Sequence, residues 1–203
     1  MGKKINPTYF IFCEGKTELA YIKYLKRKYR FASIAIDSVK KGNAISKQFI
    51  ENYKKDKFTD DKDLDFLMYD IDAPRMLEKL EAIPDTILLS SNPCIELWFL
   101  LHHKNQKANI KTVDCIREIK NRCSGYEKSN LCRPLIKKLE ESESKAIKRA
   151  KELNKNQNPS SNVNVLVKSL SVLINNVPYP SLHFCIFITH ENTVSRHRWG
   201  FKF

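Results

Sequence analysis

The sequence predicts an α/β fold in which a mostly parallel sheet is flanked by helices. Up to residue 103, short apolar segments typical of buried strands alternate with segments whose apolar residues recur at helical spacing. The chain has 203 residues, 42% hydrophobic and 29% charged, with five glycines. This composition excludes a disordered or fibrous chain and is sufficient for a buried core. We expect a single domain over residues 1–203, with its core at 8–103.

The first two elements are a strand at 8–15 and a helix at 16–30. The strand segment TYFIFCEG is apolar and ends in Glu-Gly, and the helix carries Leu19, Ile22 and Leu25 near helical spacing. The rest of the core is expected as strand 31–39, a turn at 41–43, helix 44–55, strand 64–72, helix 75–81 and strand 86–91. This alternation predicts a parallel sheet.

The segment Ser91-Asn92-Pro93 predicts the start of the next helix, 94–103. Asn is a strong N-cap residue, and Pro fits the first helical position because it lacks a donor that would be unsatisfied there. After His103 the chain is rich in Lys, Asn, Glu and Ser. We expect a basic helical insertion or cap at about 104–160, with its clearest helix at 142–155. A closing helix and a strand (182–189) are expected within 161–190, followed by a polar tail at 191–203.

The net charge of +13 is unevenly distributed along the chain. Basic residues dominate 1–60 and 101–203, whereas acidic residues dominate 61–100. An excess of this size favours polyanionic partners, although a solvated surface gives the same tally.

The six cysteines include no C-x-x-C pair, which argues against a zinc knuckle or a thioredoxin-like redox motif. Cys13, Cys94 and Cys185 lie in apolar runs and are expected to be small buried hydrophobic residues. No apolar run approaches the ~20 residues of a membrane helix, and the N-terminal segment is unlike a secretory signal. We expect a cytoplasmic protein with reduced thiols.

Four acidic residues follow or lie near the expected strand ends. Glu14 follows the first strand, Glu18 falls in the first turn of the next helix, and Asp70 and Asp72 end the third strand. Because ligands bind at the carboxyl ends of strands in such sheets, we expect these carboxylates to hold Mg²⁺ or Mn²⁺. Helix-dipole effects account equally for Glu18, and turn chemistry for the Asp pair, when each is taken singly.

The order Glu14-Gly15 followed by Asp70-Ile71-Asp72 resembles the Toprim fold of topoisomerases, primases and OLD-type nucleases. More narrowly, CEGKTE (13–18), SSNPCIELWFLLHH (90–103) and NPSSNVNVLVKSL (158–170) resemble the RloB-like family, a Toprim-related group linked to bacterial restriction and abortive-infection loci. The resemblance covers roughly residues 8–175. It implies a Toprim-like domain acting in antiphage defence, with a metal-dependent nuclease site.

The resemblance assigns Glu14 to the Toprim glutamate and Asp70 and Asp72 to its aspartate pair. Asn92 and Glu96 lie in the RloB-like segment and are candidates to complete the site, although helix capping also explains both. Many relatives carry one more residue after the first glutamate, so the choice between Glu14 and Glu18 as the metal ligand stays open. The predicted catalytic residues are Glu14, Glu18, Asp70, Asp72 and Glu96, and the predicted metal ligands are Glu14, Glu18, Asp70 and Asp72.

Basic side chains are expected to contact nucleic acid. Lys16 lies in the turn after Glu14, and Lys145, Lys148 and Arg149 share a helical face. His102 and His103 end an apolar helix, where an imidazolium suits the helix C-terminus, and a general-base role for His103 is the alternative. Trp98 is expected in the core.

The leading hypothesis is a Mg²⁺- or Mn²⁺-dependent nuclease that hydrolyses DNA or RNA. The alternative is a non-catalytic nucleic-acid-binding or regulatory subunit of an ATPase encoded nearby, as the resemblance to two-gene defence systems suggests. Primase-like nucleotidyl transfer would use the same carboxylates, but no segment of the sequence indicates a separate domain for binding a nucleotide or a template. With no Walker-type loop, any ATP-dependent step belongs to another protein. The sequence leaves open whether the substrate is DNA or RNA and whether cleavage is internal or from an end. It also leaves open the oligomeric state, and a homo-oligomer is one possibility.

Overall fold

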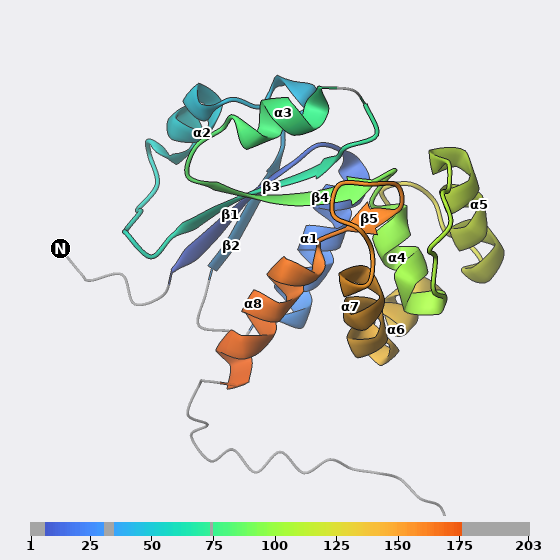
Figure 1. The fold of residues 1–203 in the computed structure, drawn as a ribbon. Coiled ribbons are helices and arrows are strands. Elements are labelled where there is room, and N and C mark those ends of the chain that lie inside the picture. The colour runs from blue at the N-terminus through green and yellow to red at the C-terminus, as the bar shows by residue number, and fades with distance from the viewer. Residues whose placement is uncertain (1–6, 31–34, 74, 176–203) are drawn as a thin grey trace, which may run out of the picture.

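A computed structural model describes residues 7–30, 35–73 and 75–175, with side chains up to residue 172. Its five-stranded sheet has the order β2-β1-β3-β4-β5 (Figure 1). The strands are β1 (Thr8–Cys13), β2 (Ala35–Lys40), β3 (Leu64–Asp70), β4 (Thr86–Asn92) and β5 (Ser160–Ser161). The first four are parallel, and β5 runs antiparallel to β4. The predicted α/β fold with a mostly parallel sheet is confirmed.

Helices cover both faces of the sheet. Those in the first half are α1 (Lys16–Lys28), the 3₁₀ turn η1 (Gly42–Ala44), α2 (Lys47–Lys54), α3 (Met76–Glu81) and α4 (Glu96–His103). The second half contributes α5 (Thr112–Arg122), α6 (Arg133–Glu141), α7 (Glu143–Lys151) and α8 (Asn164–Asn175). One face packs against α2 and α3, and the other against α1 and α4 together with the helices that follow α4 (Figure 1).

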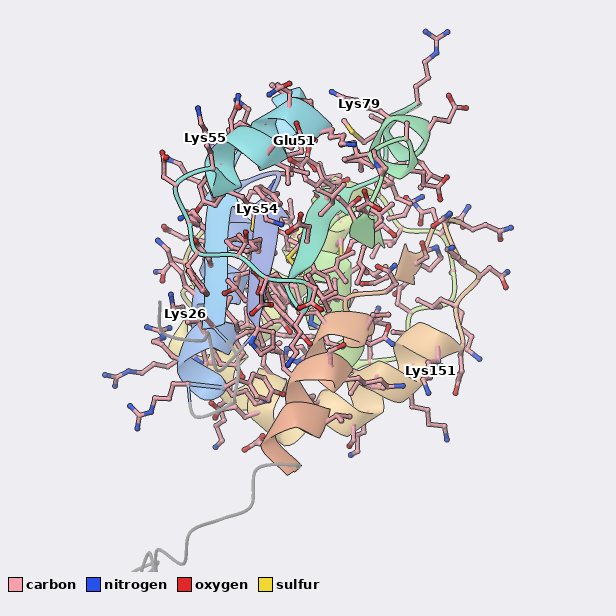
Figure 2. All side chains as sticks on the ribbon, turned by 90° about the vertical axis from the view of Figure 1, so that its left-hand side faces the viewer. Lys26, Glu51, Lys54, Lys55, Lys79 and Lys151 are labelled. Atoms are coloured by element: carbon pink, nitrogen blue, oxygen red, sulfur yellow. The ribbon has the colours of Figure 1, made fainter. Side chains whose placement is uncertain are left out.

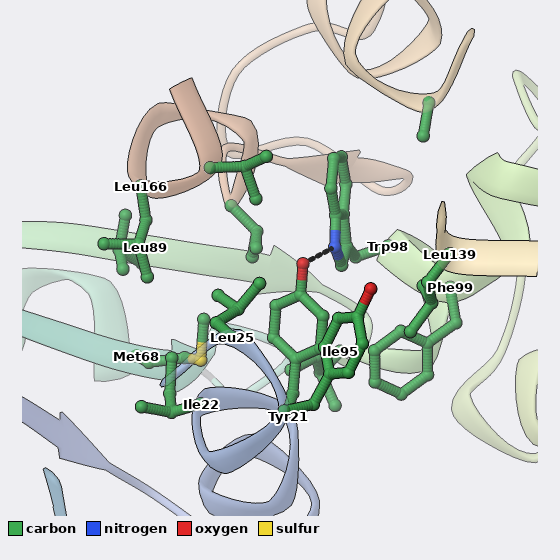
Figure 3. Close-up of a cluster of buried hydrophobic side chains, with 14 of the residues drawn as sticks. Tyr21, Ile22, Leu25, Met68, Leu89, Ile95, Trp98, Phe99, Leu139 and Leu166 are labelled. Atoms are coloured by element: carbon green, nitrogen blue, oxygen red, sulfur yellow. Dashed lines mark hydrogen bonds between the residues drawn. The ribbon is translucent and has the colours of Figure 1, made fainter. Parts of the chain in front are cut away.

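Side-chain alternation along β1 explains these two cores. Phe10 and Phe12 pack on the α2 side, whereas Tyr9, Ile11 and Cys13 pack on the α1 side. At the centre of the larger core, Trp98 of α4 is fully buried and donates its indole N–H to the Tyr21 hydroxyl of α1 at 2.8 Å (Figure 3). The prediction that Trp98 lies in the core is confirmed, and this contact fixes α4 against α1.

The strand register places the ends of β1, β3 and β4 at one edge of the sheet. Cys13 pairs with Met68, and Asp70 pairs with Ser91. Because these strands are parallel, the residues that follow them leave the sheet on the same side. Glu14 and Asp70 therefore lie close together.

The predicted start of α4 is wrong. Asn92 is the last residue of β4 rather than a helix cap, and the helix begins at Glu96 with Ile95 at the N-cap position. Asn92 stays extended because it pairs with Ser160 of β5, and its side-chain amide donates to the Asn156 carbonyl at 3.4 Å. A long-range strand pairing overrides the local helix-start signal.

The region after His103 folds as α5, α6 and α7, and each of these helices packs against α4. The helix expected at 142–155 is α7, which ends at Lys151. Four described cysteines, Cys13 and Cys94 among them, are buried, and all five described cysteines are free thiols. The expected strand 182–189, the tail, Cys185 and residues 31–34 of the second expected strand lie outside the described residues. Within the described ranges, no helix has the length and apolar character needed to cross a bilayer.

Candidate functional site

A pocket of about 310 Å³ lies at the carboxyl edge of the sheet, where β1 and β3 end. Four acidic side chains reach it from four separate places in the chain. They come from the β1–α1 turn, the first turn of α1, the end of β3 and the start of α4. The lining residues are Glu14, Gly15, Lys16, Thr17, Glu18, Asp70, Glu96, Lys128 and Ser129.

Glu14 is held between the two central strands. Its backbone N–H donates to the Met68 carbonyl at 3.0 Å, which continues the β1–β3 pairing one residue past the strand. Its carboxylate Oε2 accepts a hydrogen bond from the Asp70 backbone N–H at 2.8 Å. Both contacts tie Glu14 to the end of β3, so the carboxylate has little freedom to leave the pocket.

Glu18 folds back over the turn that precedes its helix. Gly15 is the N-cap of α1 and Glu18 is three residues on, where a glutamate can reach the free backbone N–H groups of the first turn. The backbone N–H groups of Gly15 and Glu18 accordingly favour its charged form. A Cβ atom at Gly15 would lie 2.7 Å from Glu18 Oε2. A side chain at position 15 would therefore displace the Glu18 carboxylate from its present place.

Asp70 carries the least satisfied carboxylate of the four. It ends β3, and its Oδ1 atom is buried with no hydrogen-bond partner in the part of the chain that the structure describes. A buried acceptor without a donor costs about 1–3 kcal/mol. Such an atom at the wall of a pocket is suited to bind a cation or a proton that the folded chain does not itself supply.

Glu96 completes the acidic set from the first turn of α4. It is 1% exposed, and its Oε1 atom accepts a hydrogen bond from the Tyr126 hydroxyl at 2.9 Å. Tyr126 lies in the loop after α5, so this contact brings a distant segment against the pocket. The bond orients the Glu96 carboxylate toward the pocket that it lines.

Burial and mutual repulsion oppose ionisation of this cluster. Desolvation raises the pKa of Glu18 to about 7, and the negative charges of Glu96 and Glu14 add to the effect. Desolvation likewise raises the pKa of Asp70 well above its usual value, with contributions from Glu18 and Glu14. The pKa of Glu14 is raised by burial, while its bond from the Asp70 backbone opposes the shift. Glu18 and Asp70 therefore hold protons more tightly than ordinary carboxyl groups, and a bound cation would replace those protons.

Two lysines lie beside the carboxylates. Lys16, a predicted site residue, is exposed at the start of α1, and Lys128 projects from the loop after α5. The positive charge of Lys128 partly offsets the rise that burial causes in the pKa of Glu14. The loop is anchored by the Ser129 backbone N–H, which donates to Thr17 Oγ1 at 3.2 Å. Sequence reasoning missed Lys128 and Tyr126, because no local motif marks a loop that reaches the site only through tertiary contacts.

Asp72 lies just outside the pocket. It is exposed in the segment after β3, and its Oδ2 accepts a hydrogen bond from Thr112 Oγ1 at 3.4 Å. Its charge is still near enough to raise the pKa values of Glu14 and Asp70. The structure thus groups Glu14, Glu18, Asp70 and Glu96, with Asp72 at the rim.

The other predicted basic contacts lie on α7, away from the pocket lining. Lys145 and Lys148 are exposed. Arg149 is half-buried, and its guanidinium donates to the Leu101 carbonyl of α4 at 2.6 Å. That contact satisfies a carbonyl near the C-terminus of α4 and ties the two helices together.

The two histidines of α4 are also remote from the carboxylates. His102 is buried, its Nδ1 lies 2.9 Å from the Trp98 carbonyl, and burial lowers its pKa to about 4, so the ring is neutral. His103 Nε2 lies 3.5 Å from Cys123 Sγ. Neither residue lines the pocket, and Asn92, the remaining candidate, contacts the loop before β5.

The donor set fits a hard divalent cation. Carboxylate oxygens are the ligands that Mg²⁺ and Mn²⁺ prefer, and the unpartnered Asp70 Oδ1 supplies one of them. In the described ranges, no three His, Cys, Asp or Glu side chains stand close enough together to coordinate an ion directly. Binding therefore requires the side chains to close around the ion or to reach it through water, which Mg²⁺ commonly retains.

Comparison with known proteins adds a family to this geometry. Residues 9–170 match the RloB-like protein family. The chain belongs to the RloB-like family. The match begins in β1 and ends in α8, so it includes the four pocket carboxylates and Lys128. Comparisons with curated proteins and with solved structures gave no match.

Proposed function

We propose that this RloB-like protein is a nuclease that uses Mg²⁺ or Mn²⁺ to hydrolyse phosphodiester bonds of DNA or RNA. One observation carries the proposal: Glu14, Glu18, Asp70 and Glu96 line a single pocket at the carboxyl edge of an α/β sheet. This edge is where open α/β sheets bind their ligands. Clustered carboxylates with raised pKa values are typical of metal and acid-base sites.

The destabilisation that these buried carboxylates cause supports a functional role for them. Glu18 and Glu96 are 5% and 1% exposed, each lies near other acids, and neither forms a salt bridge with any residue that the structure describes. Buried carboxylates placed together destabilise a fold unless a proton or cation neutralises them. An ordinary core residue would remove that cost. A chain that keeps four acids here is expected to use them.

The two lysines suit the proposed substrate. Lys16 and Lys128 stand at the pocket next to the acidic side chains, so one site combines ligands for a cation with positive charge for a phosphate. The net charge of +13 favours a polyanion over a small neutral substrate. The exposed Lys145 and Lys148 on α7 extend the basic surface.

The proposed roles follow from the contacts. Glu14, Asp70 and Glu18 hold the cation, with Asp72 at the rim, and Glu96 is fixed by Tyr126 to accept a proton or to orient a ligating water. When bound, the cation lowers the pKa of a coordinated water and offsets charge on the phosphate. Lys16 and Lys128 position the phosphate at the pocket mouth.

The resemblance to the Toprim fold agrees with these roles, since it aligns Glu14 with the Toprim glutamate and Asp70 and Asp72 with its aspartate pair. As the resemblance implies, we further propose that the nuclease acts in antiphage defence, with an ATPase encoded nearby as partner. The basic helices α5–α7 then form a cap beside the site. We propose these as parts of the same function.

A cleavage assay on mixed DNA and tRNA tests the proposal. Purified protein is incubated with Mg²⁺, with Mn²⁺ and with EDTA, beside the variants Asp70→Ala and Glu51→Gln. Glu51 is an exposed acid on α2 (Figure 2) and does not line the pocket, so its variant removes one negative charge outside the site. We expect cation-dependent cutting that Asp70→Ala reduces at least a hundredfold and Glu51→Gln leaves unchanged.

Three results would overturn the proposal that the protein is a nuclease. These are cutting that survives in Asp70→Ala, cutting that EDTA does not stop, and chain extension from nucleoside triphosphates in place of shortened strands. Binding of nucleic acid without any cutting, in the presence of the partner ATPase as well, would instead identify a regulatory subunit.

A further inference from the structure

A second pocket, of about 160 Å³, lies where α7 ends and α8 begins, beside β4 and β5. It shares no lining residue with the carboxylate pocket. Its walls contain the Ser160-Ser161-Asn162 segment, which is part of the NPSSNVNVLVKSL motif (158–170) that the carboxylate site does not use. Its polar lining includes Lys151, Lys155, Ser160, Ser161, Asn162 and Asn164.

Within the described residues, the charged side chains that line this pocket are both lysines. Lys151 and Lys155 are exposed and line it, and the described part of the lining includes no acidic residue. Lys168 of α8 contacts Lys151, and that contact lowers the pKa of Lys168. Figure 2 shows Lys151 on the side of the molecule formed by α7 and α8. Ammonium groups brought together with no acid between them attract an anion.

The N-terminus of α8 lies at this pocket. Asn162, Asn164 and Val165 line the pocket, and the helix that begins at Asn164 has 12 residues. The Asn162 N–H already donates to the Ser90 carbonyl at 3.1 Å and the Val165 N–H to the Asn162 carbonyl at 2.9 Å, so what the start of α8 offers an anion is chiefly its dipole, which favours negative charge at this end. A phosphate is the anion that such helix ends commonly bind.

Ser160 points independently to a ligand. It is 5% exposed and lines the pocket, yet its hydroxyl has no hydrogen-bond partner among the described residues. Its neighbours are already engaged: Ser161 Oγ lies 3.2 Å from Ser91 Oγ, and Asn162 Oδ1 accepts from the Ser90 backbone N–H at 2.6 Å. A buried hydroxyl left without a partner costs about 1–3 kcal/mol, which a ligand oxygen would relieve.

We propose that this second pocket binds a phosphate group, with Lys151, Lys155, the Ser160 hydroxyl and the start of α8 as its partners. The volume is below the roughly 300–1,000 Å³ of sites that enclose drug-sized molecules, so a phosphate enters while the attached sugar and base stay outside. The phosphate comes from a nucleic-acid strand or from a free nucleotide.

The sheet register relates this pocket to the carboxylates. Asp70 pairs with Ser91, and Ser91 pairs with Ser161, so Ser161 lies two strands from Asp70. With neighbouring strands about 4.8 Å apart, the two backbones are separated by roughly 10 Å. If the proposed nuclease function holds, the second pocket anchors a strand near the bond to be cut. Binding itself does not depend on that function.

Calorimetric titration of the full-length protein with inorganic phosphate tests the site. EDTA is present throughout, so that no cation bridges phosphate to the carboxylate pocket. We expect Ser160→Ala and Lys151→Gln each to weaken binding about tenfold. Lys120→Gln, which removes the same charge from an exposed position on α5, should leave binding unchanged. Equal affinity in all four proteins, or a loss in Lys120→Gln as large as in Lys151→Gln, would overturn the proposal.

Stability and a second set of probes sharpen the test. Ser160→Ala removes an unpartnered hydroxyl, so its thermal midpoint without phosphate should equal or exceed that of the wild type.

A nucleoside 5′-monophosphate and a short single-stranded oligonucleotide are then titrated separately. Loss of oligonucleotide affinity in Ser160→Ala supports a strand as the source, and loss of monophosphate affinity supports a free nucleotide. Asp70→Asn should retain phosphate affinity even if every cleavage assay fails, which separates this site from the nuclease proposal.

Discussion

The same two helices build two buried clusters of opposite character. From α1, Tyr21 enters the aromatic core and Glu18 enters the acidic pocket, and from α4, Trp98 and Glu96 do the same. The Trp98 indole N–H donates to the Tyr21 hydroxyl oxygen at 2.8 Å, so this buried donor is satisfied. The acids, by contrast, repel one another, and Asp70 Oδ1 has no partner among the described residues. The aromatic cluster therefore stabilises the fold, whereas the acidic cluster destabilises it.

This difference indicates how the pocket is held in place. Trp98 packs on Tyr21, and His102 packs edge-on against Trp98 with ring centroids 4.7 Å apart. Rigid packing a turn or less from Glu18 and Glu96 prevents the acids from moving apart to relieve their repulsion. A carboxylate cluster of this kind needs such a support, because unsupported acids would turn to solvent. Changes to the two clusters should therefore have opposite effects on stability.

Truncating the aromatic core has the largest expected effect on stability. Trp98→Ala should lower the free energy of unfolding by about 3–5 kcal/mol, because it leaves a cavity at a fully buried site. Chemical denaturation measures this. Tyr21→Phe is the matched milder change: it keeps the ring but leaves the Trp98 N–H without its acceptor, for a loss of about 1–3 kcal/mol. A loss below 1 kcal/mol in Trp98→Ala would show that this core does not support the pocket.

Neutralising an acid should stabilise the fold. The pKa of Glu18 is raised to about 7, so the folded state holds its proton more tightly than the unfolded chain. Stability from this residue is highest below pH 4 and declines as pH rises from about 4 to 7. Glu18→Gln lacks that decline, so at pH 8 it should be more stable than the wild type by about 1–3 kcal/mol.

Denaturation at several pH values in EDTA checks this prediction. The advantage of Glu18→Gln should shrink as the pH falls and vanish near pH 4, and the exposed Glu51→Gln should show none at any pH. A Glu18→Gln protein less stable than the wild type at pH 8 would contradict the repulsive character of the cluster. Added Mg²⁺ should narrow the gap by stabilising only the wild type, since a bound ligand raises the stability of the state that binds it.

The sequence allowed the strand-end acids to be predicted, because apolar runs and the residues that close them are local features. Glu14 and Asp70 follow from two such runs and from parallel pairing. Tyr126 and Lys128 could not be predicted, since their loop reaches the site through bonds to Glu96 and Thr17, at 30 and 112 residues' separation. The prediction that Asn92 caps a helix was wrong for the same reason, because its conformation is set by its pairing with β5, which is distant in the sequence.

The smallest expected effect on stability comes from the turn between β1 and α1. At Gly15 the backbone is extended, with φ −125° and ψ −172°, so alanine introduces no left-handed strain. Its Cβ, however, would stand 2.7 Å from Glu18 Oε2 and displace that carboxylate. Gly15→Ala should therefore change stability by less than about 1 kcal/mol and yet weaken Mg²⁺ binding about tenfold. Titration of Gly15→Ala and of a control variant, Gly125→Ala, with Mg²⁺ separates the effect on cation binding from the effect on stability. Gly125 is a suitable control because no atom lies within 4 Å of its Cβ position. Because Gly125 has a φ of +79°, its variant should lose stability and keep Mg²⁺ affinity, the reverse of Gly15→Ala. If both variants bind Mg²⁺ equally well, the placement of Glu18 has no part in holding the cation.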